Sequence, residues 1–351
     1  MTSPRADSDH GIVLLDADDG NHARSSGYSA LAAYLPDAQR ISERRSAPRG
    51  ILQRATVSVL SRLAVTRWYQ LSSAALEWRA WQRGRRFDGI FHMMWADRDW
   101  GFLDLVLNRR RHRLCGTFHG CPDSLPDTLH FRSRLAPLDA VILMSEVQRD
   151  FFQTNGVPAE KIHVVHHGVD TTFFTPGPAR RDRECFKVLS VGSYRRNFQL
   201  LRKVCERLAN ERSVRFKIVT SRQHHKLFAG LDNVEVATGL SDDELLETYR
   251  QADCLLLTTE AATANNGLLE ALACGLPVVA ETIGGIPEYV SPECAKLVPP
   301  GSDEALEDAI GLLRRNRDER GRMSAFARRR AEELDWKNVA EKTKEVYRQI
   351  T

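Results

Sequence analysis

The sequence lacks the cysteine pattern of a protein from an oxidising compartment and the long apolar segments of a membrane protein. Its seven cysteines are an odd number and include no Cys-x-x-Cys pair, so neither a disulfide framework nor a structural zinc site is expected. The longest apolar runs, such as residues 254–257 and 276–280, are far too short to span a bilayer. Residues 1–10 are polar and contain no apolar core of a secretory signal. We therefore expect a protein of the reducing cytoplasm.

Lysine is absent before Lys161, and arginine supplies the positive charge of the first half of the chain. Residues 40–86 contain eleven Arg, no Lys and two acids, Glu43 and Glu77. One explanation is a GC-rich genome and a solvated helix face. The other is a basic surface for an anionic substrate or for anionic lipid on the inner face of the cytoplasmic membrane. No nucleic-acid partner is expected, because the segment has no recognisable nucleic-acid-binding motif.

Length and patterning predict two globular domains of the α/β class. The chain has 351 residues, of which 42% are hydrophobic and 27% charged, and a domain commonly takes about 100–200 residues. Strand-like runs alternate with helical patterns on both sides of a Pro-, Gly- and charge-rich linker at residues 176–184. We expect two doubly wound, Rossmann-like domains, at residues 1–175 and 185–334, that face each other across a cleft. Such domains bind ligands beyond the carboxyl ends of their strands.

The individual elements follow from the apolar pattern. Strands are predicted at 11–15, 89–95, 114–118, 139–144 and 162–166, and then at 186–191, 216–220, 234–237, 254–257 and 278–280. Residues 51–86 are mostly helical in pattern. Helices are predicted at 146–154, 197–210, 242–251 and 267–274, and helical stretches at 302–316 and 324–350. Ser145 and Ser241 are suited to cap the helices that follow them.

Two segments resemble a known family. Residues 139–176 hold a strand ending in Ser145, a helix, and then Gly-Val-Pro, Lys-Ile-x-Val and His-Gly-Val-Asp. Residues 233–301 hold Glu-Ala-x-Ala-Cys-Gly-x-Pro-Val-Val followed by Gly-Gly-Ile-Pro-Glu. Both resemble the family 4 retaining glycosyltransferases of the GT-B fold, and the second motif is highly specific for that superfamily. The resemblance covers residues 87–351 well and residues 11–86 weakly.

The resemblance implies transfer of a sugar from a nucleotide-diphosphate sugar to an acceptor hydroxyl, with retention of anomeric configuration. It implies that the first domain binds the acceptor, that the second binds the donor, and that a final helix at residues 335–351 packs back on the first domain. It implies neither a metal ion nor another cofactor, and a UDP-sugar more often than a GDP-sugar. The implied acceptor is a glycan, a lipid-linked saccharide or a small molecule, in cell-envelope, glycolipid or natural-product glycosylation.

The segment after the predicted strand at 186–191 is the candidate diphosphate site. It opens a helix, whose N–H groups and dipole favour phosphate, and cationic side chains must neutralise the leaving nucleotide if no metal does so. Against the family pattern, Gly192 matches its Gly, Ser193 replaces its Arg, and Arg196 falls near its Lys, with Arg195 beside it. We expect Arg196 to contact the diphosphate. The alternative is a surface Arg at a helix N-terminus, which is electrostatically unfavourable without an anion.

Glu270 matches the family's second acidic residue, which accepts hydrogen bonds from the ribose hydroxyls. The alternative is an acid in the first helical turn that interacts with the helix dipole. The family's first acid has no counterpart, because Ala262 stands eight positions before Glu270. The segment Thr-Ala-Asn-Asn resembles a subset of the family that lacks that acid.

Three alternatives follow from the missing acid. Asn265 and Asn266 supply amide donors to the sugar or phosphate, with Gly267 allowing close backbone approach. Alternatively, Glu260 reaches in from a bulged loop. The third alternative is loss of sugar binding with survival of nucleotide binding, which would make the chain a nucleotide-sugar-binding or scaffolding protein. A sugar-nucleotide epimerase or a phosphorylase of the same fold is a further alternative.

The remaining site residues rest on the resemblance as well. His119, in Thr-x-His-Gly, matches a family His in the cleft beside the donor sugar, although an ordinary loop His is the alternative. Gly27 corresponds loosely to the family's Gly-rich first loop. Gly239 and Leu240 match the loop whose backbone contacts the nucleotide base.

His92 is expected to be structural. No metal site is expected at the acid pairs 16/18, 97/99 and 242/243, although the pair 97/99 is a candidate to line the acceptor side.

Overall fold

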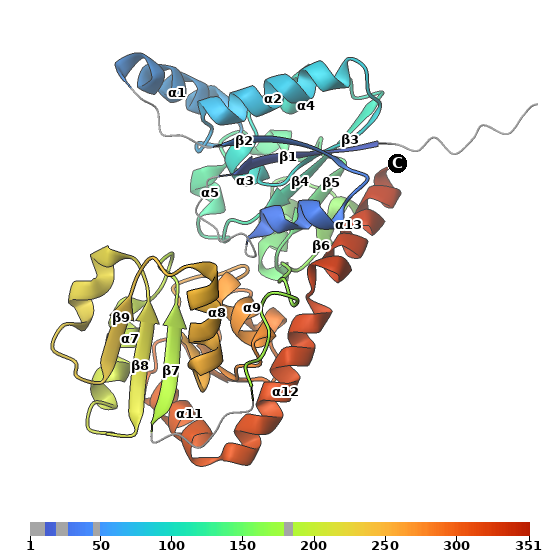
Figure 1. Ribbon diagram of the computed structural model, residues 1–351. Helices are drawn as coiled ribbons and strands as arrows, with labels where there is room; N and C mark the ends of the chain where they lie inside the picture. The colour runs from blue at the N-terminus through green and yellow to red at the C-terminus, as the bar shows by residue number, and fades with distance from the viewer. Residues whose placement is uncertain (1–10, 19–26, 45–49, 179–184) are drawn as a thin grey trace, which may run out of the picture. The chain divides into compact units, whose positions relative to one another are not determined.

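The computed structural model describes residues 11–18, 27–44, 50–178 and 185–351 (Figure 1). Contacts between residues divide the chain into two compact units. Of the described chain, unit 1 comprises residues 11–18, 28–166 and 339–351, and unit 2 comprises Gly27 and residues 167–338. Among the described residues, no helix combines the length and the apolar composition needed to cross a bilayer.

Unit 1 is built on a six-stranded parallel sheet of order β2-β1-β3-β4-β5-β6. Its inner strands are buried on both faces, which explains their continuous apolar sequence. The strands are β1 Gly11–Asp18, β2 Gln39–Arg44, β3 Gly89–Met93, β4 His112–Phe118, β5 Ala140–Leu143 and β6 Ile162–Val164. The helices are η1 Tyr28–Tyr34, α1 Ile51–Leu63, α2 Leu71–Gly84, α3 Ala96–Asp99, α4 Leu103–Val106, α5 Leu125–Thr128, η2 Arg132–Arg134, η3 Glu146–Gln148, α6 Arg149–Thr154 and η4 Ala159–Lys161.

The segment 51–86 is mostly helical, as predicted, and it forms two helices, α1 and α2. Between them the chain is extended: the Thr66 N–H donates to the Trp100 carbonyl at 3.1 Å, and Thr66 forms an antiparallel bridge with Leu129. Ala64 and Val65 are fully buried at this break. Their apolar side chains continue the helical spacing of the sequence, so the pattern alone does not reveal that the helix ends.

Unit 2 is built on a second six-stranded parallel sheet, of order β12-β11-β10-β7-β8-β9. The strands are β7 Phe186–Val191, β8 Val214–Val219, β9 Val234–Ala237, β10 Cys254–Leu257, β11 Val278–Glu281 and β12 Ala295–Val298. The helices are α7 Phe198–Arg207, η5 Arg222–Phe228, α8 Asp242–Gln251, α9 Asn266–Ala273, α10 Ile286–Tyr289, α11 Asp303–Arg315 and α12 Arg317–Glu333, and the chain closes with α13 Trp336–Ile350. Together the two sheets confirm the predicted α/β class with two doubly wound domains.

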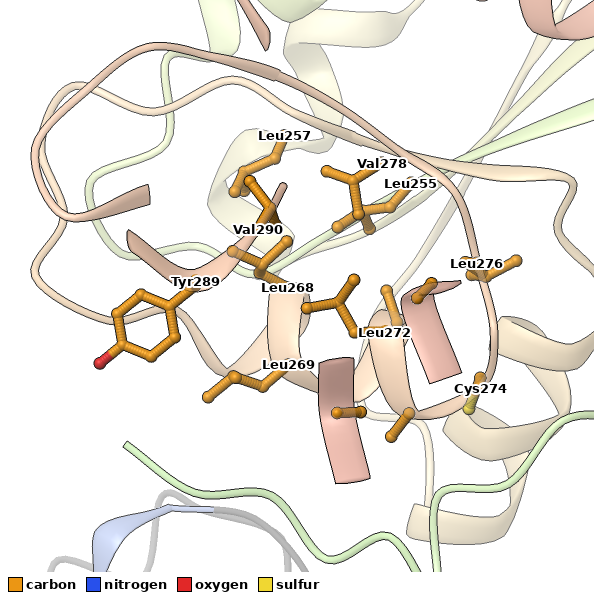
Figure 2. Close-up of a cluster of buried hydrophobic side chains, with 14 of the residues drawn as sticks. Leu255, Leu257, Leu268, Leu269, Leu272, Cys274, Leu276, Val278, Tyr289 and Val290 are labelled. Atoms are coloured by element: carbon orange, nitrogen blue, oxygen red, sulfur yellow. The ribbon is translucent and has the colours of Figure 1, made fainter. Parts of the chain in front are cut away.

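Helix α9 lies in the core of unit 2. Its residues from Gly267 to Ala273 are all buried, and Leu268 and Leu272 belong to one hydrophobic cluster with Leu255 of β10 and Val278 of β11 (Figure 2). A helix that is buried all round needs apolar residues all round. Glu270 is the one ionisable side chain of this helix, so its carboxylate needs polar partners inside the protein.

The end of the chain returns to unit 1. The chain bends between α12 and α13, where Val169 accepts the Trp336 N–H and donates its own N–H to Leu334. Val169, Leu334 and Trp336 all belong to unit 2, which begins again at residue 167, whereas the sequence predicts the end of the first domain at 175. Residues 179–184 of the predicted linker lie outside the described residues. From Val339 onward the chain belongs to unit 1.

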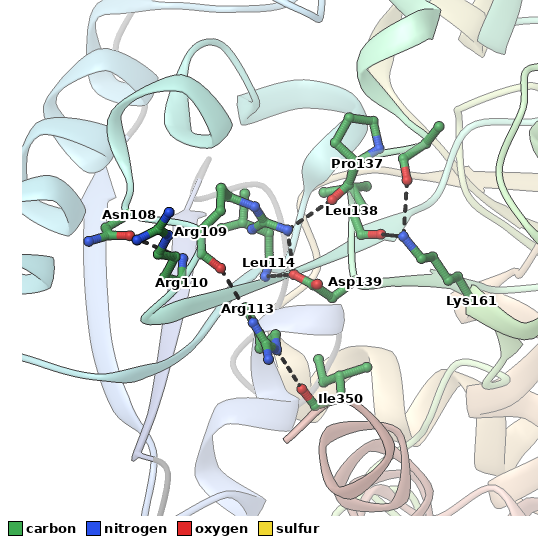
Figure 3. Close-up of polar contacts among 11 residues, drawn as sticks. Asn108, Arg109, Arg110, Arg113, Leu114, Pro137, Leu138, Asp139, Lys161 and Ile350 are labelled. Carbon is green, nitrogen blue, oxygen red and sulfur yellow. Dashed lines mark hydrogen bonds and ion pairs between the residues drawn. The ribbon is translucent and has the colours of Figure 1, made fainter.

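Two contacts hold α13 on unit 1. The Arg113 Nε of β4 donates to the Ile350 carbonyl at 3.0 Å, beside a cluster in which Asp139 accepts the Leu114 N–H at 2.7 Å (Figure 3). In the second contact, the Tyr347 hydroxyl of α13 lies 2.5 Å from His92 Nδ1 of β3. Burial lowers the pKa of His92 to about 3, so the ring is neutral in the folded protein. His92 therefore has a structural place in the core.

Candidate functional site

The strand order of unit 2 reverses between β7 and β10, and ligands of α/β sheets bind at such a point beyond the carboxyl ends of the strands. Two loops meet there. The first, residues 192–197, runs from β7 to α7, and the second, residues 258–265, runs from β10 to α9. Each loop leads into a helix N-terminus, and N–H groups at a helix N-terminus favour an anion.

The two loops are joined by hydrogen bonds to the backbone of Arg195. The Arg195 carbonyl accepts the Thr259 hydroxyl at 2.8 Å and the Glu260 N–H at 3.0 Å. Arg196 and Thr259 also form an antiparallel bridge. Arg195 has a φ of 50°, in the left-handed region that only a few per cent of non-glycine residues adopt. The loops therefore form one continuous surface rather than two independent segments.

Arg196 is held inside this surface. Its Nε and Nη2 donate to the Val191 carbonyl at 3.1 and 2.8 Å, and Nη2 also donates to Asn265 Oδ1 at 3.1 Å. Burial lowers the pKa of Arg196 to about 10, against the opposing effect of nearby Tyr249 and Glu270, so the guanidinium is charged at neutral pH. The structure thus brings Arg196 and Glu270 together at the reversal point. Contact between Arg196 and a diphosphate stays a prediction.

Glu270 is 4% exposed and is oriented by a tyrosine. The Tyr249 hydroxyl, from α8, donates to Glu270 Oε2 at 2.7 Å. Burial and the neighbouring carboxylate of Glu270 raise the pKa of Tyr249 well above its usual range, so the phenol keeps its proton as a donor. Sequence patterning does not identify Tyr249, because its helical spacing is that of an ordinary core residue. Acceptance of ribose hydroxyls by Glu270 stays a prediction.

In the Thr-Ala-Asn-Asn segment and the residue before it, the fixed points are the Asn265 side chain and the Ala262 carbonyl. Asn265 Oδ1 caps α9 by accepting the Leu268 N–H at 3.1 Å, in addition to the bond from Arg196. Ala262 is buried, and its carbonyl accepts the Gly285 N–H at 2.9 Å. Asn266 is half-buried at the first position of α9, whereas Glu260 is exposed. The oxygen of Asn265 therefore has a structural use that the predicted role as an amide donor does not include.

The predicted donor loop begins at Gly192, which has a φ of 111°. A Cβ at this position would lie 2.5 Å from Arg196 Nη2, so a side chain there cannot coexist with the observed guanidinium. Ser193 lies next to it, with its hydroxyl 3.0 Å from that of Thr220 and accepting the Ser221 N–H at 2.9 Å. Ser193 thus connects the ends of β7 and β8.

The same sheet edge holds further polar groups and loop residues near the ends of β9 and β11. Gly239 and Leu240 follow β9; Gly239 is exposed with a φ of 68°, and Leu240 is half-buried. Glu281, which the sequence analysis does not single out, ends β11. Its Oε2 accepts the Thr259 N–H at 3.2 Å and its Oε1 accepts the Gly301 N–H at 2.7 Å. The signal that marks it is a carboxylate at the end of a buried apolar strand.

His119 lies at the carboxyl end of β4, at the corresponding edge of the unit 1 sheet. Its ring stacks on Trp95, with centroids 4.1 Å apart, and meets the edge of Tyr28 at 4.7 Å. Its Nε2 donates to the Met94 carbonyl at 2.9 Å. Asp97 Oδ2 accepts the backbone N–H of His119 at 3.0 Å. These contacts fix the ring, and its contact with a donor sugar stays a prediction.

Other predicted residues of unit 1 have mainly structural contacts. Ser145 accepts the Val147 N–H at 3.3 Å and caps η3, as expected. Gly27 has a φ of 91° immediately before η1, and residues 19–26 of the predicted first loop lie outside the described residues. Asp97 and Asp99 are both 4% exposed. Within the described ranges, no three His, Cys, Asp or Glu side chains are grouped so that they could hold a metal ion.

Comparison with known proteins matches both units. Residues 28–173 match the family model described as Glycosyltransferase Family 4, and residues 185–316 match that of Glycosyl transferases group 1. The MMP alpha-(1->4)-mannosyltransferase of Mycolicibacterium hassiacum is 33% identical over 213 residues, which are 58% of this chain and 51% of that one. This chain thus spans about half the length of that relative. A D-inositol 3-phosphate glycosyltransferase of Saccharomonospora viridis is 24% identical over 318 residues, 79% of this chain and 74% of that one.

A solved structure supports the fold. Anabaena HepE in complex with UDP-glucose superposes with a TM-score of 0.70 at 16% identity, covering 95% of this chain and 98% of that one. At this level of identity the likeness shows the fold alone, which is the two-domain α/β fold of GT-B glycosyltransferases.

Proposed function

We propose that the chain transfers a sugar from a nucleotide-diphosphate sugar to an acceptor hydroxyl. Its two units both match glycosyltransferase models of the family 4 type. The donor binds unit 2 at the point where the strand order reverses. The observation that carries this proposal is the convergence there of a half-buried cation, Arg196, and a buried carboxylate, Glu270, with the N-termini of α7 and α9. A UDP-sugar is the proposed donor, in preference to a GDP-sugar, and HepE was solved with UDP-glucose.

The proposed step retains the anomeric configuration. The bond between the anomeric carbon and the diphosphate oxygen breaks, the acceptor oxygen bonds to the same face of that carbon, and the acceptor proton passes to the departing phosphate. Negative charge therefore accumulates on the nucleoside diphosphate. Arg196, Arg195 and the N–H groups at the two helix N-termini are the proposed neutralising groups, and Glu270 accepts the ribose hydroxyls. His119 is proposed to contact the transferred sugar, and no metal ion takes part.

A panel of nucleotides tests the donor assignment. UDP should raise the melting temperature most, and at a hundredfold excess over its Kd it should stabilise unit 2 by about 2.7 kcal/mol. UMP should stabilise much less, because it lacks the second phosphate that Arg196 is proposed to contact. Thermal shift with UDP, GDP, ADP and the matching monophosphates measures the order.

Absence of a shift with every nucleoside diphosphate contradicts the donor site. The measurements are made in EDTA, and a requirement for added Mg²⁺ would overturn the proposal that no metal takes part. Ala262, in place of the family's first acid, favours one alternative function, a protein that binds a nucleotide-sugar without transferring the sugar. Tight UDP-sugar binding without turnover, on a panel of glycan and lipid-linked acceptors, would support that alternative.

The Gly192→Ala variant tests whether the loop after β7 must leave room for Arg196. Alanine at a positive φ costs about 1–2 kcal/mol of stability, and here it also displaces the guanidinium, so the Kd for UDP should rise about tenfold or more. The matched control is Gly230→Ala, because Gly230 has a φ of 84° with no atom within 4 Å of its added Cβ. Calorimetry should find UDP affinity kept in the control. Equal affinities in the two variants would show that the position of Arg196 is irrelevant to binding.

A further inference from the structure

Helix α1 carries an apolar stripe that the folded protein leaves in solvent. Leu52 is 82% exposed, Val59 55% and Leu63 56%, and Ile51 at the start of the helix is 85% exposed. The positions 52, 59 and 63 recur at the spacing that places side chains on one face of a helix. No residue of α1 is buried. In Figure 1 the helix lies at the periphery of unit 1, whereas α2 packs on β1 and β2.

This stripe is not needed for the core of unit 1. The half-buried residues of α1 are Val57, Leu60 and Ser61. At about 100° per residue, Val57 and Ser61 lie about 160° around the helix from Val59, and Leu60 lies about 100° from it. Folding alone therefore gives no reason for leucine and valine at the exposed positions, where polar residues are usual. A contiguous exposed apolar patch marks a contact with a partner or a membrane.

The segment that carries the stripe is strongly cationic. Residues 50–86 contain seven Arg, no Lys and one acid, Glu77. Glu77 is 6% exposed and faces inward, where its carboxylate accepts the N–H groups of Gly101 and Leu103 at the start of α4. On α1 itself, Arg54 and Arg62 are both exposed. The surface of this segment thus has cations without acids of its own to balance them.

Exposed tryptophans accompany the arginines. Trp68 follows α1 and is 54% exposed, and Trp78 on α2 is 57% exposed. Trp78 packs on Trp81 with ring centroids 4.8 Å apart, and the Arg85 guanidinium lies 5.4 Å from the Trp81 ring. Tryptophan favours the region between lipid headgroups and acyl chains, because its ring is apolar and its N–H is polar. Arginine binds phosphate through two parallel hydrogen bonds and is weakly hydrated.

We propose that α1 docks its apolar stripe into the surface of a bilayer that contains anionic lipids. The helix lies in the plane of the membrane, with Leu52, Val59 and Leu63 among the upper acyl chains and Arg54 and Arg62 at the phosphates. A second copy of the chain is not the expected partner of the stripe, because two such cationic segments would repel each other. The inference goes beyond the proposed function, since it does not depend on what unit 2 binds.

Flotation of the full chain with lipid vesicles tests the proposal. The chain should float with vesicles of equimolar phosphatidylglycerol and phosphatidylcholine, and bind vesicles of pure phosphatidylcholine at least about tenfold more weakly. Raising the ionic strength from about 0.1 M to about 1 M shortens the Debye length from about 10 Å to about 3 Å and should release much of the bound protein.

Two double variants test separately what the apolar stripe and the arginine charges contribute to vesicle binding. L52Q with V59Q should weaken binding about tenfold or more, because two apolar side chains no longer enter the acyl region. R54Q with R62Q should weaken binding to the anionic vesicles about fivefold per arginine and leave binding to phosphatidylcholine unchanged. The matched control is L105Q with V106Q, which removes two exposed apolar side chains, 68% and 45% exposed, from α4 of the same unit.

All of the substituted residues are exposed, so melting temperatures should match the parent protein. Binding that is independent of anionic lipid, or unchanged by the double substitution in α1, overturns the proposal. Sedimentation equilibrium measures whether the chain forms a dimer. A dimer that L52Q with V59Q converts to a monomer would show that the stripe binds a second copy of the chain instead.

Discussion

Replacing Arg196 with alanine should lower kcat/KM for the nucleotide-sugar by about 10²–10³-fold, the usual effect of removing one donor that stabilises a developing anion. The guanidinium is charged and lies between the Val191 carbonyl and Asn265 at the point where the two loops of unit 2 meet. Its loss removes positive charge where the nucleoside diphosphate is proposed to depart. Steady-state kinetics with the donor that the nucleotide panel identifies, together with UDP calorimetry, measures both the rate and the binding effect.

Arg196 also supports the loop, so its controls must separate charge from folding. Arg196→Lys keeps the charge but loses the paired hydrogen bonds to Val191, and it should recover part of the rate. Lys203→Ala removes an exposed cation from the same region, on α7, and should have parent kinetics. If the alanine variant melts near the parent temperature and retains parent kcat/KM and UDP affinity, Arg196 does not contact the diphosphate.

The Glu270→Ala variant should raise the donor KM by about 10–100-fold while kcat changes little. A hydrogen bond to a charged group contributes about 1.5–3 kcal/mol, and the carboxylate is proposed to accept hydroxyls of the ribose, which does not react. The Tyr249→Phe variant removes the hydroxyl that orients the carboxylate and should raise KM by a smaller factor, about fivefold. Initial-rate kinetics over donor concentration gives both constants.

The split between KM and kcat decides the role of Glu270. A fall in kcat at unchanged KM would place its carboxylate in the chemical step rather than on the ribose. Parent kinetics in the Tyr249→Phe variant would show that the 2.7 Å bond has no part in positioning.

Much of unit 2 follows from local sequence, and the predicted bounds of β9, α8 and β10 are those of the structure. Each of these elements has a clear local signal. Ser241, for example, forms the capping box with Glu244 that begins α8. The edge strand β2 is not predicted, because its sequence, QRISER, is polar and alternates in burial. β2 therefore lacks the apolar residues on which the prediction depends, whereas the edge strand β9, with the sequence VEVA, has them.

The candidate site is only partly readable from the sequence. Arg196 and Glu270 come from a family resemblance, and the structure places them at one reversal point. The bond from Tyr249 to Glu270 is not predicted, because it joins side chains of two different helices. The sequence analysis names Asn265 as an amide donor but does not predict that its oxygen accepts bonds from both Leu268 and Arg196. Local motifs identify residues that begin helices, whereas such shared hydrogen bonds exist only after the sheet has formed.

The backbone bonds between Arg195 and the segment Thr259–Glu260 have a consequence for engineering. Loops of α/β enzymes are often exchanged singly to alter substrate preference, on the premise that each is an independent insert. Here the residue of the first loop with a left-handed φ, Arg195, is the one whose carbonyl accepts both bonds from the second loop. A graft intended to change the donor would therefore have to carry residues 192–197 and 258–265 as a matched pair from one parent.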